Sequence, residues 1–284
     1  MTAPTADWDG TAYHRLSEPQ FAWGLAVLAR LELRGDETVV DAGCGSGRLT
    51  AALLDRLPHG RVIAVDRSES MLAVAERELR PRYGGRIELV CADLLDLDLD
   101  RAADVVFSTA TFHWVLDHPR LFAVLHRALR PDGRLHAQCG GGANLRHVKA
   151  RANRLVGAPE LRGWFEGWSP PWEYADAETT RRRLEQAGFA GVATSLEPAP
   201  TILDDRATYR AFVATVILRP YLARIPDASL RDELLDRMCD EAAGDQPPWS
   251  LDYWRLNMTA TINRSPHSFP HNPHEHGGAI PGVG

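Results

Sequence analysis

The sequence is almost devoid of lysine. It contains 32 basic residues, and because Lys149 is the only lysine, the other 31 are arginines. Walker-type phosphate loops, pyridoxal enzymes and protein kinases each require a lysine in a defined local context. Lys149 lies in none of these contexts. The shortage of lysine therefore excludes these three chemistries.

Cysteines and long apolar runs are also scarce. The four cysteines, Cys44, Cys91, Cys139 and Cys239, form no C-x-x-C pair, so neither a disulfide framework nor a cysteine zinc site is indicated. The longest apolar run, at about residues 21–29, is far shorter than the roughly 18 residues of a membrane span. The acidic amino terminus has no basic region of the kind that begins a signal peptide. We therefore expect a cytoplasmic protein without a membrane partner.

Acidic residues outnumber basic ones, 38 to 32, which gives a formal net charge of -6. Proteins that bind duplex nucleic acid usually present a basic face, so no nucleic-acid partner is expected. Residues 265–284 are rich in proline and glycine and predict a disordered tail. The tail histidines have no acidic or cysteine partners in a folded frame, so no metal site is predicted. These histidines are His267, His271, His274 and His276.

Residues 38–138 alternate short β-rich runs with helical patterns, which is typical of a parallel sheet covered by helices. The expected strands are residues 38–41, 61–66, 87–92, 103–108 and 134–138. The expected helices between them are residues 49–57, 70–80 and 119–129. The run Val62-Ile63-Ala64-Val65 is apolar at successive positions, as expected for a strand that is buried on both faces.

The alternation stops at Gly140-Gly141-Gly142. Beyond this point we expect a helix at residues 177–187, a strand at 191–197, helices at 206–218 and 229–242, and a final strand at 251–262. The predicted parts of the chain are a cap (1–34), a cofactor-binding Rossmann-like core (35–139), an inserted substrate-facing segment (140–176), the rest of the sheet with inserted helices (177–264), and the tail (265–284).

The strongest local signal joins a strand that ends in an acid to alternating glycines. Asp41 ends the first strand, and three glycines follow it at alternate positions, Gly43, Gly45 and Gly47. Such glycines let bare backbone approach a ligand above the strand ends, beside the amino terminus of a helix. Asp66 ends the second strand, where a carboxylate accepts hydrogen bonds from a ribose diol. Together these features predict a nucleoside ligand.

Two other interpretations stay open at this point. An NAD-dependent oxidoreductase shares the strand-loop-helix start and the ribose-binding acid, but its G-x-G-x-x-G fingerprint needs a glycine where this chain has Arg48. A non-catalytic binding module that keeps a cofactor fold is the second alternative.

On these motifs, residues 38–138 resemble the class I S-adenosylmethionine-dependent methyltransferases. The resemblance implies an α/β fold, with a seven-stranded Rossmann-like sheet, an N-terminal helical cap and inserted helices over the strand ends, and S-adenosyl-L-methionine as cofactor. Asp66 would hold the ribose, Asp93 would lie near the adenine amino group, and Met71 would pack on the adenine or simply fill a helix-face core position. The implied cofactor contacts are Asp41, Gly43, Cys44, Gly45, Gly47, Asp66, Arg67, Met71, Ala92, Asp93, Leu94, Ser108 and Thr109.

Two further segments narrow the resemblance. Residues 110–119 (ATFHWVLDHP) and 213–222 (VATVILRPYL) look like the corresponding parts of the trans-aconitate methyltransferase group and its carboxyl-methylating relatives. Residues 8–24 resemble the cap that covers the cofactor in this group. The resemblance implies His113 and Trp114 as catalytic-site residues. It implies Tyr13, Gln20, Trp114 and Arg219 as substrate contacts.

Each of these residues also has a structural alternative. Trp114 either donates its indole N–H to a substrate oxygen or forms an unspecific pocket wall. His113 is either a base or a structural hydrogen-bonding group. Gln20 and Tyr13 either contact substrate or serve as helix-capping or packing residues. Arg219 either grips a carboxylate with its guanidinium fork or is a solvated helix-end charge.

The chemistry of methyl transfer bears on the acceptor. A carboxylate is anionic at neutral pH and needs no general base, which agrees with the lack of an obvious catalytic dyad. We therefore predict methylation of a small or medium-sized organic acid similar to trans-aconitate. A phenol, amine or carbon acceptor is the alternative, and it would need a base, for which His113 is the first candidate.

Overall fold

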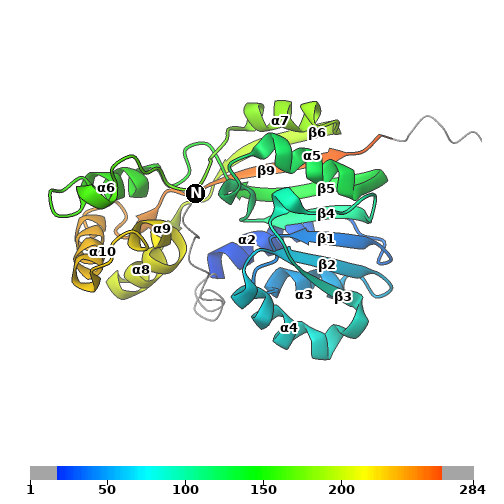
Figure 1. Ribbon diagram of the computed structural model, residues 1–284, viewed down its shortest axis with the longest axis horizontal. Coiled ribbons are helices and arrows are strands. Elements are labelled where there is room, and N and C mark those ends of the chain that lie inside the picture. Colours follow the sequence, from blue (N-terminus) through cyan, green and yellow to red (C-terminus); the bar gives the residue numbers. More distant parts are fainter. Residues whose placement is uncertain (1–17, 264–284) are drawn as a thin grey trace, which may run out of the picture.

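The computed structural model describes residues 18–263, in which a seven-stranded sheet has the order β3-β2-β1-β4-β5-β9-β6 (Figure 1). Strands β1 to β5 pair in parallel, whereas β9 is antiparallel to both β5 and β6. The expectation of a seven-stranded Rossmann-like sheet is confirmed. The strands are β1 (Thr38–Ala42), β2 (Arg61–Asp66), β3 (Ile87–Cys91), β4 (Ala103–Thr109), β5 (Leu129–Gly140), β6 (Ala190–Pro198) and β9 (Trp254–Thr261).

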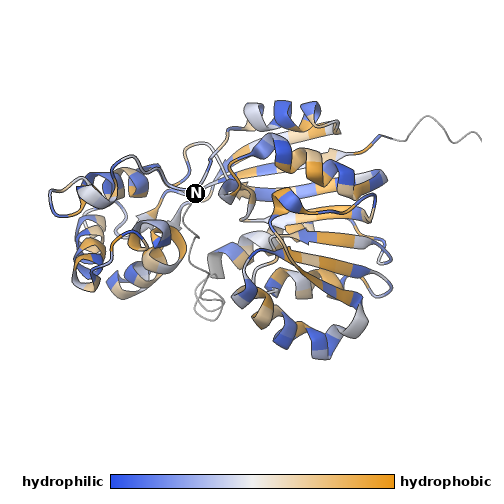
Figure 2. Ribbon diagram, viewed as in Figure 1, coloured by the Kyte–Doolittle hydropathy of each residue, from blue (hydrophilic) through white to orange (hydrophobic). Residues whose placement is uncertain are grey.

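Helices cover both faces of the sheet. One face packs against α2 (Glu18–Ala29), α3 (Arg48–Asp55) and α4 (Glu69–Tyr83), and the other against α5 (His118–Ala128) and α7 (Ala177–Gln186). Successive strand residues serve opposite faces, since Val39 and Val105 join the first cluster while Val40 and Val106 join the second. Both faces are therefore apolar, which Figure 2 shows as hydrophobic colouring along the central strands.

A helical lobe lies to one side of the sheet (Figure 1). It combines the segment after β5 with the segment between β6 and β9, and these share one hydrophobic cluster that includes Leu155, Tyr209, Tyr221 and Met238. Its elements are α6 (Arg146–Val156), α8 (Arg206–Phe212), α9 (Arg219–Leu222), α10 (Ala228–Ala242), β7 (Thr201–Ile202) and β8 (Ser250–Leu251). The lobe thus spans the predicted boundary between the 140–176 and 177–264 segments.

Three local features differ from the sequence expectations. Helix α6 was not predicted, because its three arginines and its lysine obscure the apolar positions Val148, Ala152 and Leu155 that it buries. The helix predicted at 206–218 changes after Phe212 into a π-helical stretch, Val213–Ile217, before α9 begins. Strand β5 extends back to residue 129 and on to residue 140, because it pairs with β4 at one end and β9 at the other.

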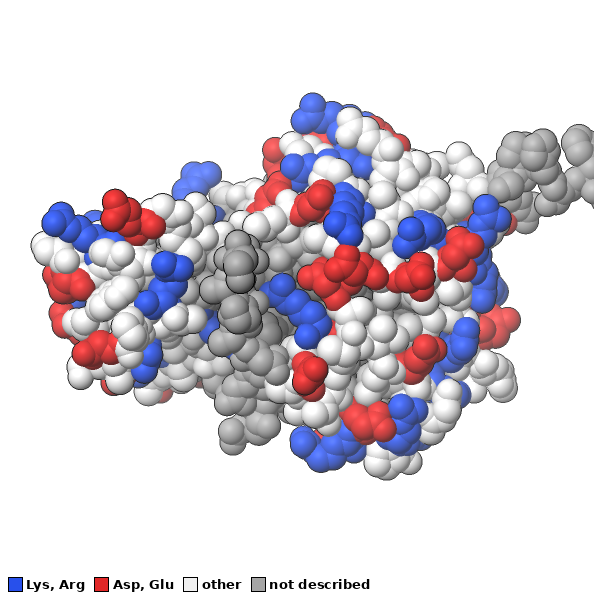
Figure 3. Space-filling model, in the orientation of Figure 1, with Lys and Arg blue, Asp and Glu red and all other residues white. Residues whose placement is uncertain are grey.

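Charged side chains of both signs are interspersed over the face shown in Figure 3. Several arginines of the described chain pair with acids, as Arg82 does with Asp55 and Arg120 with Asp96. Between residues 18 and 263, no helix combines the length and apolar character that crossing a bilayer requires. Tyr13, the first half of the predicted cap and the tail histidines lie outside the described residues.

Candidate functional site

The loop after β1 is shaped by glycines and tied to β2. Gly43 has φ +85°, and a Cβ atom at this position would lie 2.2 Å from the side chain of Thr111. The N–H groups of Gly43 and Cys44 both donate to the carbonyl of Val65, at 2.8 and 2.9 Å. The loop therefore passes close to the strand ends with its backbone exposed, which suits a ligand that lies across them.

Two aspartates stand beside this loop. Asp66 accepts hydrogen bonds from the backbone N–H groups of Gly45, at 2.8 Å, and Ser68, at 2.9 Å. It therefore fixes the loop after β1 relative to the loop after β2. Asp41 is 3% exposed and accepts a 2.6 Å hydrogen bond from the Thr50 hydroxyl. Burial raises the pKa of Asp41 to about 7, while the Thr50 bond lowers it and the charge of Asp66 raises it further.

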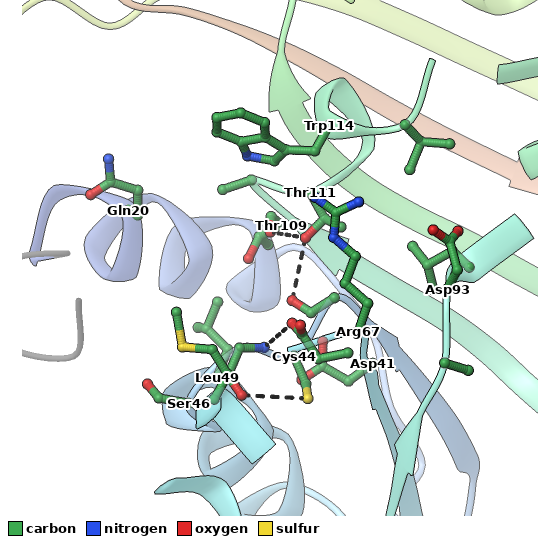
Figure 4. A pocket seen from close by; sticks show the side chains of 18 of the residues that line it. Gln20, Asp41, Cys44, Ser46, Leu49, Arg67, Asp93, Thr109, Thr111 and Trp114 are labelled. Atoms are coloured by element: carbon green, nitrogen blue, oxygen red, sulfur yellow. Dashed lines mark hydrogen bonds between the residues drawn. The ribbon is translucent and has the colours of Figure 1, made fainter. Parts of the chain in front are cut away.

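A cavity of about 620 Å³ opens above the carboxyl ends of the strands. This main cavity has the size of a small-molecule site. In the view of Figure 4, Trp114 lies on the opposite side from Cys44 and Ser46, with Gln20 of α2 and Asp93 at the two flanks. Of the predicted cofactor contacts, the following line it: Asp41, Gly43, Cys44, Gly45, Asp66, Arg67, Met71, Ala92, Asp93, Leu94 and Thr109.

The predicted residues Gly47 and Ser108 do not line the main cavity. Gly47, with φ +84°, caps α3, and a Cβ there would lie 2.7 Å from a Leu79 side-chain atom. The Ser108 hydroxyl is buried and donates to the carbonyl of Ala42 at 2.7 Å, which joins β4 to β1. Both residues therefore serve the packing of the elements that carry the cavity.

A smaller cavity, here called the inner chamber, adjoins the main cavity. Three residues line both, namely Gln20, Ala110 and Trp114. Ala110 has φ +54°, a left-handed conformation that is uncommon for a residue other than glycine and is typical of functional sites. The other residues that line the chamber are His113, Asn144, Leu145, Trp172, Tyr174, Val216, Ile217, Tyr253 and Arg255.

His113 is buried on the wall of the inner chamber. Its Nδ1 accepts a 3.3 Å hydrogen bond from the backbone N–H of Gly140, and its ring stacks on Tyr174 with centroids 5.6 Å apart. Burial above all, and then the positive charge of Arg255, lower its pKa to about 3. A neutral histidine that already accepts a structural hydrogen bond favours the structural alternative over the general base.

The segment that carries His113 and Trp114 is braced against residues 172–174 of the inserted segment. The imidazole of His118 lies 3.0 Å from the carbonyl of Phe112 on one side and 3.0 Å from a guanidinium nitrogen of Arg183 on the other. Arg183 also donates to Glu173 at 2.6 Å, and the Glu173 N–H donates to the carbonyl of His113 at 2.8 Å. This network holds residues 172–174 over the strand ends, where Trp172 meets Trp114 edge-on with centroids 5.5 Å apart.

Sequence reasoning missed several residues of the site. Arg48 of α3 lines the main cavity with its guanidinium 3.9 Å above the Phe21 ring, and only its place directly after the glycine motif pointed to it. Arg255 and Asn144 line the inner chamber from parts of the chain that no motif marked. Arg219, the predicted carboxylate-binding arginine, lines neither cavity. Tyr13 lies outside the described residues.

Comparison with known proteins places this site in a family. The profile of the methyltransferase domain family matches residues 39–133. Trans-aconitate 2-methyltransferase of Variovorax paradoxus is 31% identical over 251 residues, which cover 83% of this chain and 90% of the relative. Trans-aconitate 2-methyltransferase of Methylobacterium nodulans is 30% identical over 275 residues, which cover 91% of this chain and 100% of the relative. The chain belongs to the S-adenosylmethionine-dependent methyltransferases. Within them, its relatives are of the trans-aconitate 2-methyltransferase group.

Other relatives and solved structures agree with this family. The enzyme of Acidovorax ebreus is 39% identical, but the match spans only 46% of this chain and 49% of that relative. The phosphoethanolamine N-methyltransferase 2 of Haemonchus contortus, solved with S-adenosyl-L-methionine, aligns with 90% of this chain and 57% of its own at a TM-score of 0.58 and 17% identity. A methyltransferase structure from Bacillus halodurans aligns with 85% of this chain and 99% of its own at a TM-score of 0.58 and 14% identity.

These findings settle the cofactor of this methyltransferase as S-adenosyl-L-methionine, and they favour neither the NAD-dependent oxidoreductase nor the non-catalytic module. The main cavity fits this cofactor on the structure's own evidence. A Cβ at Gly45, which lines the cavity, would meet no protein atom within 4 Å and would stand in the open glycine cradle. Asp66 and Asp93 present acceptors that suit the hydroxyl and amino donors of an adenosine. In the described residues, no cluster of three or more His, Cys, Asp or Glu side chains is placed to hold a metal ion.

Proposed function

We propose that this methyltransferase transfers a methyl group to a carboxylate oxygen of a small organic acid similar to trans-aconitate. The observation that supports it most is the region where the main cavity and the inner chamber meet. Gln20, Ala110 and Trp114 line both cavities there, and none of the three is ionisable at neutral pH. His113, with a pKa of about 3, is too weak a base to activate a phenol or an amine near neutral pH.

A carboxylate acceptor needs no such base. When bound, the cofactor supplies a methyl group on a positively charged sulfur, so that the acceptor oxygen bonds to the methyl carbon as the carbon–sulfur bond breaks and sulfur keeps the electron pair. No proton is released, because an anionic oxygen becomes a neutral ester. The residues of this chain therefore act by binding, orienting and excluding water.

Several residues are suited to hold the cofactor in the main cavity. We assign the ribose to Asp66, whose carboxylate has acceptor sites beyond the two that Gly45 and Ser68 use. Met71 is 4% exposed and lines the cavity, so it can serve both as core and as a contact for the adenine. Asp41 is suited to the cationic amino group of the methionine part, since a positive charge nearby favours its ionised form.

At the acceptor end, Gln20 and Trp114 are the proposed contacts. The Gln20 side chain is 9% exposed, its amide nitrogen lies 3.5 Å from the Tyr253 hydroxyl, and its Oε1 has no hydrogen-bond partner within residues 18–263. The half-buried Trp114 ring lines both cavities and meets Trp172 of the inner chamber edge-on. Both side chains thus lie where an acceptor would meet the cofactor methyl group.

The proposal is tested with methyl-labelled cofactor and a panel of acids, phenols and amines that includes trans-aconitate. We expect a labelled product that mild base hydrolyses to volatile methanol, because methyl esters are cleaved under these conditions and methylated phenols, amines and carbons are not. Activity on phenols or amines alone, with a base-stable product, would overturn the proposal. Asp66→Ala should abolish cofactor binding and transfer, whereas the exposed Asp204→Ala should change neither.

A further inference from the structure

The inner chamber has polar side chains in its lining that cofactor binding does not explain, among them Asn144 and Arg255. It adjoins the main cavity through Gln20, Ala110 and Trp114 and has a volume of about 40 Å³. Because one water needs about 10–15 Å³ by this measure, the chamber has room for about three non-hydrogen atoms. This is the size of a carboxylate group and much smaller than a nucleoside.

Arg255 reaches the chamber because of the sheet topology. Strand β9 runs antiparallel to β5, so its first residues lie at the carboxyl ends of the parallel strands, with Arg255 paired to Gly140. A Cβ atom at residue 140 would lie 2.7 Å from the Asn144 amide nitrogen and 2.8 Å from a ring carbon of Tyr174. Glycine at this position therefore lets Asn144 and Tyr174 close over the strand ends beside Arg255.

The guanidinium of Arg255 is held in place by aromatic rings. Arg255 is only 4% exposed, and its guanidinium carbon lies 3.9 Å from the ring centroid of Trp23 and 4.9 Å from that of Tyr253. The two rings are inclined at 68° to each other, so they flank the guanidinium from two directions and restrict its position. An arginine fixed in this way suits a carboxylate, because its guanidinium fork can donate to both carboxylate oxygens.

The positive charge of Arg255 shifts the pKa values of two other residues that line the chamber. It lowers the pKa of His113, after the larger effect of burial, and it partly offsets the rise that burial causes in the pKa of Tyr174. Both of these groups are neutral near pH 7. Among the residues between 18 and 263 that line the chamber, Arg255 alone then carries a formal charge. The described lining of the chamber thus includes one cationic side chain, whereas Gln20, Ala110 and Trp114 at the junction are uncharged.

We propose that the inner chamber is a subsite for a second carboxylate of the acceptor, which Arg255 binds while the first carboxylate lies at Gln20 and Trp114 for methylation. The inference rests on the proposed function and makes it more specific, because it selects dicarboxylic and tricarboxylic acids over monocarboxylic acids. Arg255 is in this sense a specificity-determining residue. It takes the role that sequence reasoning gave to Arg219, which lines neither cavity.

The test compares fumarate with crotonate, in which a methyl group replaces one of the two carboxylates. Dissociation constants are measured for both in the presence of S-adenosylhomocysteine. We expect the wild-type protein to bind fumarate at least about 30-fold more tightly, which is the lower end of the loss when one member of a buried charge pair is removed. Equal binding of the two acids to the wild type overturns the proposal without recourse to any variant.

Arg255→Gln should abolish this preference by weakening fumarate binding and leaving crotonate binding unchanged. Arg255→Lys, which keeps the charge but not the fork, should retain part of it. Arg237→Gln, at an exposed site on α10, should leave it intact. Loss of the preference in Arg219→Gln together with its persistence in Arg255→Gln would overturn the proposal in favour of the other arginine. Binding of S-adenosylhomocysteine and the Tm of each variant show that the fold is kept.

Methylation rates separate this inference from the function on which it rests. If the wild type methylates trans-aconitate and the preference for fumarate survives in Arg255→Gln, the subsite is refuted and the function stands. If the wild type methylates no acid but its preference for fumarate depends on Arg255, the function is refuted and the carboxylate subsite stands.

Discussion

Asp41 is a buried acid whose charge costs stability and, in the proposed function, serves cofactor binding. The substitution Asp41→Asn separates the two effects. Asparagine has nearly the same shape and can still accept the hydrogen bond that the Thr50 hydroxyl donates at 2.6 Å. Burial raises the pKa of Asp41 from 3.8 to about 7. The folded protein therefore binds this proton more tightly than the unfolded chain does. The stability gained from the proton is complete below pH 3.8 and is lost as the pH rises through about 7.

The magnitude follows from the two pKa values. Each pH unit between them is worth about 1.36 kcal/mol, so ionising the folded carboxyl costs about 4 kcal/mol in total. Between pH 5 and pH 8 the wild-type protein loses about 2.5 kcal/mol of this, whereas Asp41→Asn loses none. The free energy of unfolding of the variant, relative to that of the wild type, should therefore rise by about 2.5 kcal/mol between pH 5 and pH 8.

Urea unfolding followed by tryptophan fluorescence at pH 5 and pH 8 measures this gain as a double difference, and Asp204→Asn serves as the exposed control. An equal effect of Asp41→Asn at both pH values would refute the reasoning, because Asp41 would then be ionised throughout. Isothermal titration at pH 8 tests the functional side. We expect the variant to bind S-adenosyl-L-methionine about 10- to 100-fold more weakly, as for the loss of a hydrogen bond to a charged group. Unchanged affinity would remove Asp41 from the cofactor site.

Three further predictions concern the loop and the junction. Gly45→Ala should lower the free energy of unfolding by about 1–2 kcal/mol, because alanine is strained at the positive φ of this residue. Gly43→Ala should lower it by about 1–3 kcal/mol more, because the added Cβ would also collide with Thr111. Equal urea midpoints for the two variants would contradict this prediction. His113→Asn should leave the shape of the kcat/KM profile unchanged from pH 5 to pH 9, because the pKa of His113 is about 3, and loss of an acid limb would show that His113 is the base. Trp114→Phe should raise KM for the acceptor by about 10-fold and the Kd of S-adenosylhomocysteine by less, and the reverse order would place Trp114 on the cofactor.

The sequence predicted the sheet and the cofactor cavity well for a physical reason. The central strands β1, β2 and β4 carry apolar residues at successive positions, and a loop of the main cavity follows each of them directly. Asp41, Gly43 and Asp66 therefore line the main cavity, as their distance from a strand end predicts. The same rule also predicted a contact at Ser108, which does not line the main cavity. Its hydroxyl turns inward to the Ala42 carbonyl, and a register argument does not tell which of two neighbouring side chains points up or sideways.

The helical lobe was predicted less well, because its structure depends on contacts between distant segments. Helix α6 buries Val148 and Leu155 in a cluster shared with α8 and α10, while its own sequence carries three arginines and a lysine. The π-helical stretch Val213–Ile217, which brings Val216 and Ile217 to the inner chamber, occurs in a run whose periodicity predicts an ordinary helix. Such features follow from tertiary packing rather than from local preference.

The two arginines illustrate what motif reasoning omits. Arg219 attracted attention because it belongs to a recognisable segment, yet that segment packs Tyr221 and Leu218 into the lobe and leaves Arg219 away from both cavities. Arg255 follows two aromatic residues in a strand that resembles any other in the sequence. Its position becomes meaningful only when β9 is known to enter the sheet antiparallel beside β5, since a parallel strand in the same place would carry its first residues to the opposite edge. The direction of one strand thus decides which arginine reaches the acceptor.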